Sequence, residues 1–126
     1  MSGNRFLLDT NAVIELLRGN DKLNLLIRKS SWLGMSVISE IEFLVFPKIN
    51  NKDMKLFNLF CDRIEIIDLE SSNKILLNTI LGVRKKYKLK LPDAIIVSTA
   101  IINNAKLISR DKDFSSIKEI EKIFPE

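Results

Sequence analysis

The segment that decides the fold is residues 6–19, which read FLLDTNAVIELLRG. Its first residues, Phe6 to Leu8, form a short apolar run of the kind expected for a buried strand. Residues 9–11 supply side chains that cap helices, and the largely apolar residues after them predict a helix that Gly19 ends. Asp9 is therefore expected at the carboxyl end of the first strand, between that strand and a helix.

Strands and helices are predicted to alternate along the rest of the chain. Apolar runs predict strands at residues 32–37, 64–67 and 106–108, with a short fifth at 120–124. The helices between them are predicted to start at these positions: residue 20 or 21, Ser39, Met54, Ser71 or Ser72, and Pro92. This alternation predicts an α/β fold with a central, mostly parallel sheet of four or five short strands. Such sheets bind ligands beyond the carboxyl ends of their strands, near the point where the strand order reverses.

The composition restricts the chemistry. A chain of 126 residues with 46% hydrophobic and 29% charged residues fits one domain, spanning 1–126. Histidine is absent, which excludes Ser-His-Asp and Cys-His catalysis and zinc sites that contain histidine. Cys61 is the single cysteine, so no intrachain disulfide can form. Catalysis would have to use carboxylates, hydroxyls, lysines or a bound metal ion.

The charge and the hydropathy pattern bear on partners and location. A formal net charge of +4 permits a polyanionic partner such as a nucleic acid. No segment approaches the roughly 18 to 20 consecutive apolar residues that a membrane span needs. The first apolar run ends at Asp9, which is too early for a signal peptide. We therefore expect a cytoplasmic protein with no membrane contact.

Four acidic residues come from four separate segments. Asp9 directly follows the first predicted strand, and Asp111 follows the fourth by three residues. Glu42 lies in the helix after the second strand, and Asp93 lies in the first turn of a later helix. Each acid has a structural alternative, because Asp9 and Asp93 could cap helices and Asp111 could begin a turn. Ser39 and Glu42 could likewise form a capping box.

The convergence of these acids favours function over capping. Carboxylates that meet at one end of a sheet repel one another unless a cation compensates their charge. Because the available donors are all oxygen atoms, a hard cation such as Mg²⁺ or Mn²⁺ is expected. Such an ion could activate water and stabilise charge on a phosphate, so hydrolysis of phosphodiesters fits the site. The acids alone do not select that reaction.

Three further segments extend the pattern of residues 6–19. They are SVISEIEFL at 36–44, LPDAIIVSTA at 91–100 and LISRDKDF at 107–114. Together the four segments resemble the PIN domains, and within them the VapC-like toxin ribonucleases of type II toxin–antitoxin modules. The resemblance covers nearly the whole chain. It implies a three-layer α/β/α domain that acts as an endoribonuclease with Mg²⁺ or Mn²⁺.

By this resemblance Asp9, Glu42 and Asp93 would be the principal catalytic and metal-binding acids. Glu40 differs from Glu42 by about 200° around a helix, so the two cannot both face one pocket, and the motif selects Glu42. The fourth segment is one residue shorter than the commoner family pattern. The fourth acid is therefore either Asp111 or Asp113, with Asp111 favoured.

Two groups of residues are candidates for binding the substrate. Thr10 and Asn11 could hydrogen-bond a phosphate or the metal's water, although either could simply cap a helix. Residues 84–90, RKKYKLK, carry five cations and directly precede Leu91 and Pro92. Arg84, Lys85 and Lys86 could hold an RNA backbone near the metal. Tyr87 could stack on an unpaired base. The alternative is a solvated helix end, where lysine is favoured in any case.

The helices on either side of Pro47 are rich in large apolar residues, namely Ile41, Leu44, Val45, Phe46, Met54, Phe57 and Phe60. Most should be core, and some could form a groove for a partner helix. The resemblance implies that this partner is an antitoxin that covers the acid pocket, and it also implies a homodimer.

Two other readings compete with the ribonuclease. One is a PIN-like module that binds RNA or protein without cleaving, which would have no reason to keep mutually repelling acids. The other is a receiver or phosphatase-like α/β domain, which would need paired acids after the first strand. Residues 9–11 supply only one carboxylate, that of Asp9.

Overall fold

The computed structural model describes residues 4–126, and its centre is a five-stranded sheet. The strands are β1 (Arg5–Leu8), β2 (Trp32–Ser36), β3 (Glu65–Ile67), β4 (Lys106–Ile108) and β5 (Lys122–Ile123). Their order across the sheet is β3-β2-β1-β4-β5, and every neighbouring pair is parallel. The prediction of a mostly parallel sheet of four or five strands is therefore confirmed.

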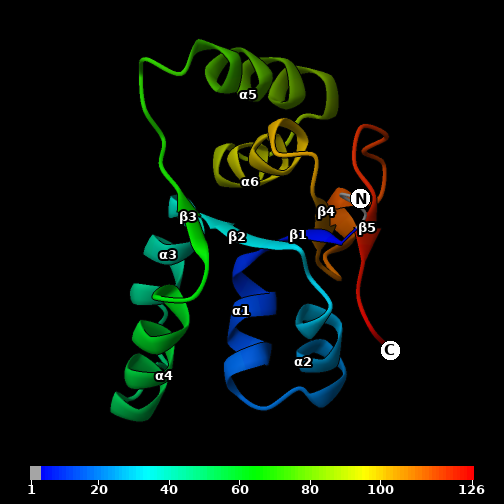
Figure 1. Ribbon diagram of the computed structural model, residues 1–126. Helices are drawn as coiled ribbons and strands as arrows, with labels where there is room; N and C mark the ends of the chain where they lie inside the picture. The colour runs from blue at the N-terminus through cyan, green and yellow to red at the C-terminus, as the bar shows by residue number, and fades with distance from the viewer. Residues whose placement is uncertain (1–3) are drawn as a thin grey trace.

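Helices cover both faces of the sheet. The six helices of the described residues are α1 (Thr10–Leu17), α2 (Asp21–Arg28), α3 (Val37–Leu44), α4 (Asn51–Cys61), α5 (Lys74–Tyr87) and α6 (Leu91–Ile102). Figure 1 shows α5 and α6 above the sheet and the first four helices below it. A short 3₁₀ helix, η1 (Lys112–Phe114), lies between β4 and β5. This is the three-layer α/β/α arrangement that the resemblance to the PIN domains implies.

Each face of the sheet carries its own hydrophobic core. Leu7 and Leu107 pack with buried residues of α5 and α6 on one face. Phe6, Leu8 and Ile108 pack with buried residues of the first four helices on the other. Because successive residues of a strand point to opposite faces, a strand covered on both sides is apolar throughout. This explains why Phe6 to Leu8 of β1 form a continuous apolar run.

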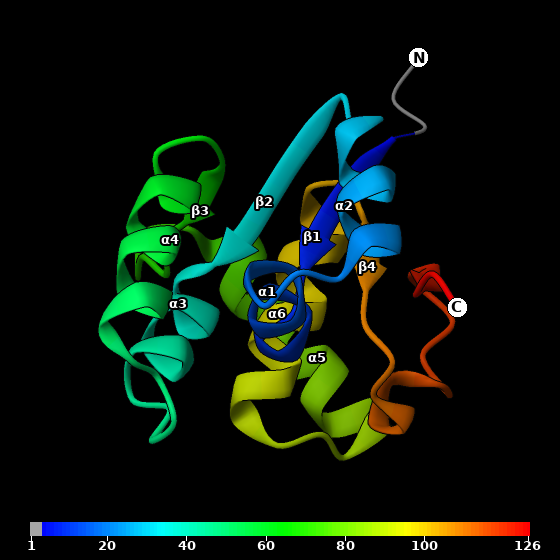
Figure 2. The ribbon, with the colours of Figure 1, turned by 90° about the horizontal axis from the view of Figure 1, so that it is seen from below.

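The carboxyl ends of the strands lie along one edge of the sheet. In Figure 2 the arrows of β1 and β2 point the same way, and η1 and the turn between α5 and α6 lie at that end. The strand order reverses between β1 and β4, whose ends are joined by a 3.2 Å hydrogen bond from the Asp9 N–H to the Ile108 carbonyl. This reversal is where open α/β sheets bind ligands.

Three predicted helix starts are wrong. Helix α4 begins at Asn51, three residues before the predicted Met54. Helix α3 begins at Val37 after Ser36, whose hydroxyl accepts the Ile38 N–H, so Ser39 and Glu42 do not form a capping box. Ser39 instead lies inside the helix with its hydroxyl buried and without a partner among residues 4–126. Helix α5 begins at Lys74 and is capped by Asn73, not by the predicted Ser71 or Ser72. Where several capping residues stand in a row, local sequence does not decide among them.

None of the helices within residues 4–126 is long and apolar enough to span a membrane.

Candidate active site

A pocket of about 350 Å³ opens at the carboxyl edge of the sheet. Four acids line it, each from a different segment: Asp9 after β1, Glu42 on α3, Asp93 on α6 and Asp111 after β4. The remaining lining residues are Thr10, Asn11, Ile14, Val45, Phe46, Pro47, Ile96 and Phe114. The structure thus brings the four acids that the sequence selects to one place. Asp113 lines a neighbouring hollow instead.

Asp9 is the most buried of these acids, with a relative exposure of 5%. Its Oδ1 accepts the backbone N–H of Ala12 at 2.8 Å, so the residue also caps α1. Burial raises the pKa of the Asp9 carboxyl, and the negative charges of Asp111 and Asp93 raise it further. Capping and pocket lining are therefore compatible at this position, and the cap holds the carboxylate at the strand end.

Asp93 lies in the first turn of α6 without capping it. The cap position belongs to Lys90, which makes no side-chain cap, so the capping alternative for Asp93 is wrong. Burial raises the pKa of the Asp93 carboxyl, followed by the charges of Asp111, Glu42 and Asp113. The nearby Lys90 opposes these effects. The charges of the four pocket acids therefore act on one another.

Glu42 is held by a neighbour in the same pocket. The hydroxyl of Thr10 donates a 2.6 Å hydrogen bond to Glu42 Oε1 and so links the start of α1 to α3. Glu40 is half-buried and does not line the pocket. Its charge acts instead on Cys61, whose thiol pKa rises to about 11 through burial and then through Glu40 and Asp62. The expectation that only one of the two glutamates faces the pocket is confirmed.

Asp111 and Asp113 divide between two cavities. Asp111 caps η1, because its Oδ1 accepts the Asp113 N–H at 2.9 Å, and its own N–H donates to Ser109 Oγ at 3.0 Å. This turn directs Asp111 to the acid pocket and Asp113 to the adjacent hollow. The sequence could not decide between them because η1 was not predicted.

The donor chemistry of the pocket fits Mg²⁺ or Mn²⁺. Its polar lining consists of carboxylate, hydroxyl and amide side chains, and these oxygen donors suit hard cations. Among residues 4–126, no three acids or thiols already stand together as a ligand set. Carboxylates without a bound cation repel one another, so some distance between them is expected. The same repulsion adds to the effect of burial in raising the pKa of Asp9 and Asp93.

Comparison with known proteins identifies the family. The sequence profile of the PIN domain matches residues 6–120. The chain belongs to the PIN domain family. Curated protein sequences give no significant match. Solved structures do, and the similar ones include toxin–antitoxin complexes.

Three of these structures show how closely the fold of this PIN domain follows that of solved structures. A chain of a toxin–antitoxin complex from Klebsiella pneumoniae is 29% identical, with a TM-score of 0.78 over 95% of this chain and 97% of that one. A chain of the promoter-bound VapBC2 complex from Rickettsia felis is 21% identical, with a TM-score of 0.74 over 96% and 98%. DNA-bound VapBC from Salmonella typhimurium gives 16% identity and a TM-score of 0.77 over 95% and 97%. The latter two show the fold alone.

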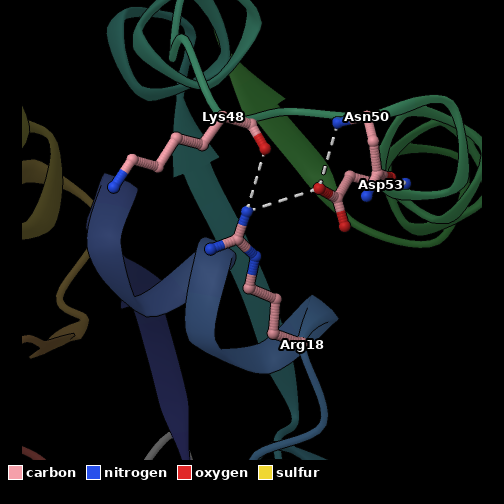
Figure 3. A network of polar contacts seen from close by, with 4 residues as sticks. All are labelled: Arg18, Lys48, Asn50 and Asp53. Carbon is pink, nitrogen blue, oxygen red and sulfur yellow. Dashed lines mark hydrogen bonds and ion pairs between the residues drawn. The ribbon is translucent and has the colours of Figure 1, made fainter.

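One wall of the PIN domain's pocket is held in place by a contact that sequence reasoning missed. Figure 3 shows Arg18, at the end of α1, reaching the loop between α3 and α4. Its Nη2 donates to the Lys48 carbonyl at 3.1 Å and lies 3.4 Å from Asp53 Oδ2. The same carboxylate oxygen accepts the Asn50 N–H at 3.2 Å, which completes a capping box at the start of α4. The loop so anchored carries Val45 to Pro47 of the pocket wall.

The cations of residues 84–90 lie in two places, on the last turn of α5 and in the turn that follows it. Arg84, Lys85 and Lys86 are exposed on the last turn of α5 and line neither cavity. Lys86 pairs with Glu119 at 3.1 Å, and the Tyr87 hydroxyl also donates to Glu119. Lys88 and Lys90, in the turn to α6, line the hollow that adjoins the acid pocket.

Proposed function

We propose that this PIN domain, spanning residues 1–126, is a Mg²⁺- or Mn²⁺-dependent endoribonuclease and the toxin of a type II toxin–antitoxin module. One observation carries the proposal: four acids from four segments line a single pocket, and the charges of their neighbours help to raise the pKa of Asp9 and Asp93. A site of mutually repelling carboxylates lowers the stability of a fold, so it is expected where a cation and a reaction need it. The similarity to chains of toxin–antitoxin complexes supports the assignment.

The metal would be held by Asp9, Glu42, Asp93 and Asp111, with Asp113 as the alternative fourth acid. When bound, the ion would activate a water molecule and stabilise the charge that develops on the RNA phosphate. The protein's own contribution is to hold the ligands in position. Asp9 is positioned by its bond from the Ala12 N–H at 2.8 Å.

The polar residues beside the acids have separate roles. Thr10 orients Glu42 through its 2.6 Å hydrogen bond, so it positions an acid more directly than it binds substrate. Asn11 is exposed on the pocket lining, where its amide can donate to a phosphate oxygen. Arg84, Lys85 and Lys86 lie further out on α5 and would contact the RNA backbone beyond the pocket.

We propose an antitoxin helix as the occupant of the apolar surface at the pocket mouth. Ile41, Leu44 and Val45, at the end of α3, are 50%, 47% and 72% exposed. Val45 also lines the acid pocket, so a helix seated on this surface would block entry to the acids. The chain from Klebsiella pneumoniae comes from a toxin–antitoxin complex, which supports a partner of this kind.

A second copy of the chain is the proposed occupant of the apolar hollow between α5 and α6. The exposed leucines Leu69, Leu81 and Leu91 border this hollow, whose lining is entirely apolar. A face that carries both projecting side chains and a matching hollow can pair with itself about a two-fold axis. Leu81→Glu should convert a dimer to a monomer in analytical ultracentrifugation, whereas Leu59→Glu, on the exposed side of α4, should not.

The ribonuclease proposal is tested by cleavage of a single-stranded RNA and a DNA of the same sequence. With Mn²⁺ or Mg²⁺ the protein should cut the RNA internally, and EDTA should stop the reaction. Asp9→Asn should abolish cleavage while leaving the circular dichroism spectrum unchanged. Metal-independent cleavage by this variant would overturn the proposal. Metal binding without hydrolysis of varied RNAs would instead favour a non-cleaving PIN-like module that binds RNA or protein.

A further inference from the structure

A second polar cavity adjoins the acid pocket, and the preceding proposal gives no role to its two lysines. It has a volume of about 220 Å³ and is lined by Tyr87, Lys88, Leu89, Lys90, Asp93 and Asp113. Asp93 lines both cavities, so the two share a wall. A strand that occupies the acid pocket can therefore continue directly into this hollow, which we call the lysine hollow.

The two lysines of the lysine hollow are free to bind an anion. Both are exposed, and neither takes part in an ion pair within residues 4–126. Lys90 occupies the cap position of α6 but makes no side-chain cap. Lys86 differs, because its ammonium group already pairs with Glu119 at 3.1 Å. The cations available beside the acids are thus Lys88 and Lys90.

The wall of the lysine hollow is held in place around Tyr87. The hydroxyl of Tyr87 donates to Glu119 and accepts the Lys118 N–H at 3.3 Å, and its ring packs against the core. Leu89 is buried beside it. A fixed aromatic ring and an apolar side chain suit the sugar and base of a nucleotide.

The backbone of Lys88 provides an independent observation. Lys88 ends α5 in the left-handed conformation, with φ 56° and ψ 36°. Helices usually place glycine or asparagine in this conformation, because a larger side chain is strained there. A lysine that keeps a strained position at the rim of a cavity is a candidate functional residue.

We propose that the lysine hollow is a subsite for the nucleotide next to the scissile phosphate of a single-stranded RNA. Lys88 and Lys90 contact the adjoining backbone phosphate, and Tyr87 and Leu89 support the sugar and base. Their positive charges also offset the acids Asp93 and Asp113, which would otherwise repel the strand. This subsite rests on the proposed ribonuclease function and extends it to a specific path for the substrate.

The test uses Lys88→Gly and Lys90→Ala. Glycine suits the left-handed conformation better than lysine, so Lys88→Gly should melt at the same temperature as the wild type or higher. Lys55→Ala is the matched control, because Lys55 is an exposed lysine of α4, on the opposite face of the sheet from the α5–α6 turn (Figure 1). Each variant is compared for KM and kcat on a labelled single-stranded RNA with Mn²⁺. Dissociation constants for the same RNA are measured in an Asp9→Asn background across a series of KCl concentrations.

Each subsite variant should raise KM about fivefold and leave kcat nearly unchanged, because a phosphate contact affects binding more than chemistry. The slope of log K against log salt should fall by about 0.7 for each lysine removed, as for other single-strand contacts. Lys55→Ala should change neither quantity.

The possible outcomes separate the two proposals. If the wild type cleaves RNA but both variants bind it as tightly as Lys55→Ala does, the subsite is overturned and the ribonuclease stands. If the wild type binds RNA without cleaving it, and both variants weaken that binding, the ribonuclease proposal fails while the subsite remains as a binding site. A melting temperature of Lys88→Gly below that of the wild type would contradict the account of its strained backbone.

Discussion

The acid pocket and the lysine hollow lie side by side and share Asp93, yet they are built in different ways. The acid pocket collects its carboxylates from four segments that are brought together by the ends of parallel strands. The lysine hollow comes mainly from one turn, residues 87–90, closed by Asp113.

The difference between the two cavities lies in how firmly their charges are held. Asp9 is 5% exposed and bonded to the backbone, and Glu42 is bonded to Thr10. Lys88 and Lys90 are exposed side chains without ion-pair partners in the described chain, residues 4–126. Metal ligands need fixed positions, whereas a phosphate contact needs only a cation within reach. Changes in the acid pocket should therefore have the larger effects.

The largest effects are expected from the loss of a pocket acid, and Asp93→Asn is the example that compares the two cavities. Loss of an outer partner of a metal ligand typically costs roughly 10–100-fold in activity, so loss of a ligand should lower kcat/KM by more than about 100-fold. Asp113→Asn changes a residue that lines the lysine hollow and not the acid pocket, so it should cost less than about tenfold. The measurement is RNA cleavage under saturating Mn²⁺. Equal losses in the two variants would show that Asp113 belongs to the acid set.

A smaller loss is expected when the bond between Thr10 and Glu42 is removed. Thr10→Val keeps the shape of the side chain but deletes the hydroxyl that donates at 2.6 Å. Activity should fall by roughly 10–100-fold, as for other outer partners of metal ligands. Thr10→Ser retains the donor and should stay close to the wild type. If serine and valine behave alike, the hydroxyl does not orient the glutamate.

Loosening the pocket wall should have a weaker effect still. Arg18→Ala removes the contacts to the Lys48 carbonyl and to Asp53 (Figure 3), which anchor the loop that carries the wall. The Arg18 side chain is 44% exposed, so the ion pair contributes about 0–1 kcal/mol to stability and the fold should survive. We expect KM to rise about threefold, in line with that energy, while kcat stays unchanged. Arg28→Ala serves as the control, because Arg28 is an exposed arginine at the end of α2.

The smallest change is expected in thermal stability. The pKa of Asp9 lies above its ordinary value of 3.8 in the folded chain, mainly through burial, so the folded state binds this proton more tightly than the unfolded state does. Its ionised form therefore lowers the free energy of unfolding above the folded-state pKa, and this cost disappears as the pH falls through that pKa. Asp9→Asn keeps an oxygen to cap α1, so without metal it should melt a few degrees higher than the wild type at pH 7.5.

The same variant gives a pH test of the account. The gain in melting temperature for Asp9→Asn should shrink as the pH is lowered toward 4, because the wild-type carboxyl then becomes neutral. Excess Mn²⁺ should reverse the order at pH 7.5, since the ion stabilises only the protein that binds it. A gain that stays constant with pH would mean that the charge of Asp9 does not cause it.

Much of the fold could be predicted because its central strands, β1, β2 and β4, are short, largely apolar runs with buried residues. The helix starts were less certain, since neighbouring residues such as Ser36 and Ser39 can each cap a helix and only packing decides between them. Asp9 and Asp111 could be placed at the pocket because they follow parallel strands that end at one edge of the sheet. Glu42 and Asp93 lie on helices, and the resemblance to the PIN domains was needed to select them.

The lysine hollow could not be predicted in the same way. It depends on the left-handed backbone of Lys88 and on η1, which folds back so that Asp113 reaches the turn before α6. The sequence suggested that the cations at the end of α5 lie near the acids. In the structure the cations near the acids are Lys88 and Lys90, in the turn that follows α5. The contact of Arg18 with Lys48 was missed for a similar reason, because it joins segments 30 residues apart.

The central claim is that the acids at the strand ends form one divalent-metal site, and Mn²⁺ titration by calorimetry tests it most directly. Glu42→Gln and Asp93→Asn should each weaken Mn²⁺ binding by about tenfold or more. Glu40→Gln should bind as the wild type does, because Glu40 is on the same helix but outside the pocket. Equal Mn²⁺ affinity in the wild type and all three variants would contradict the account.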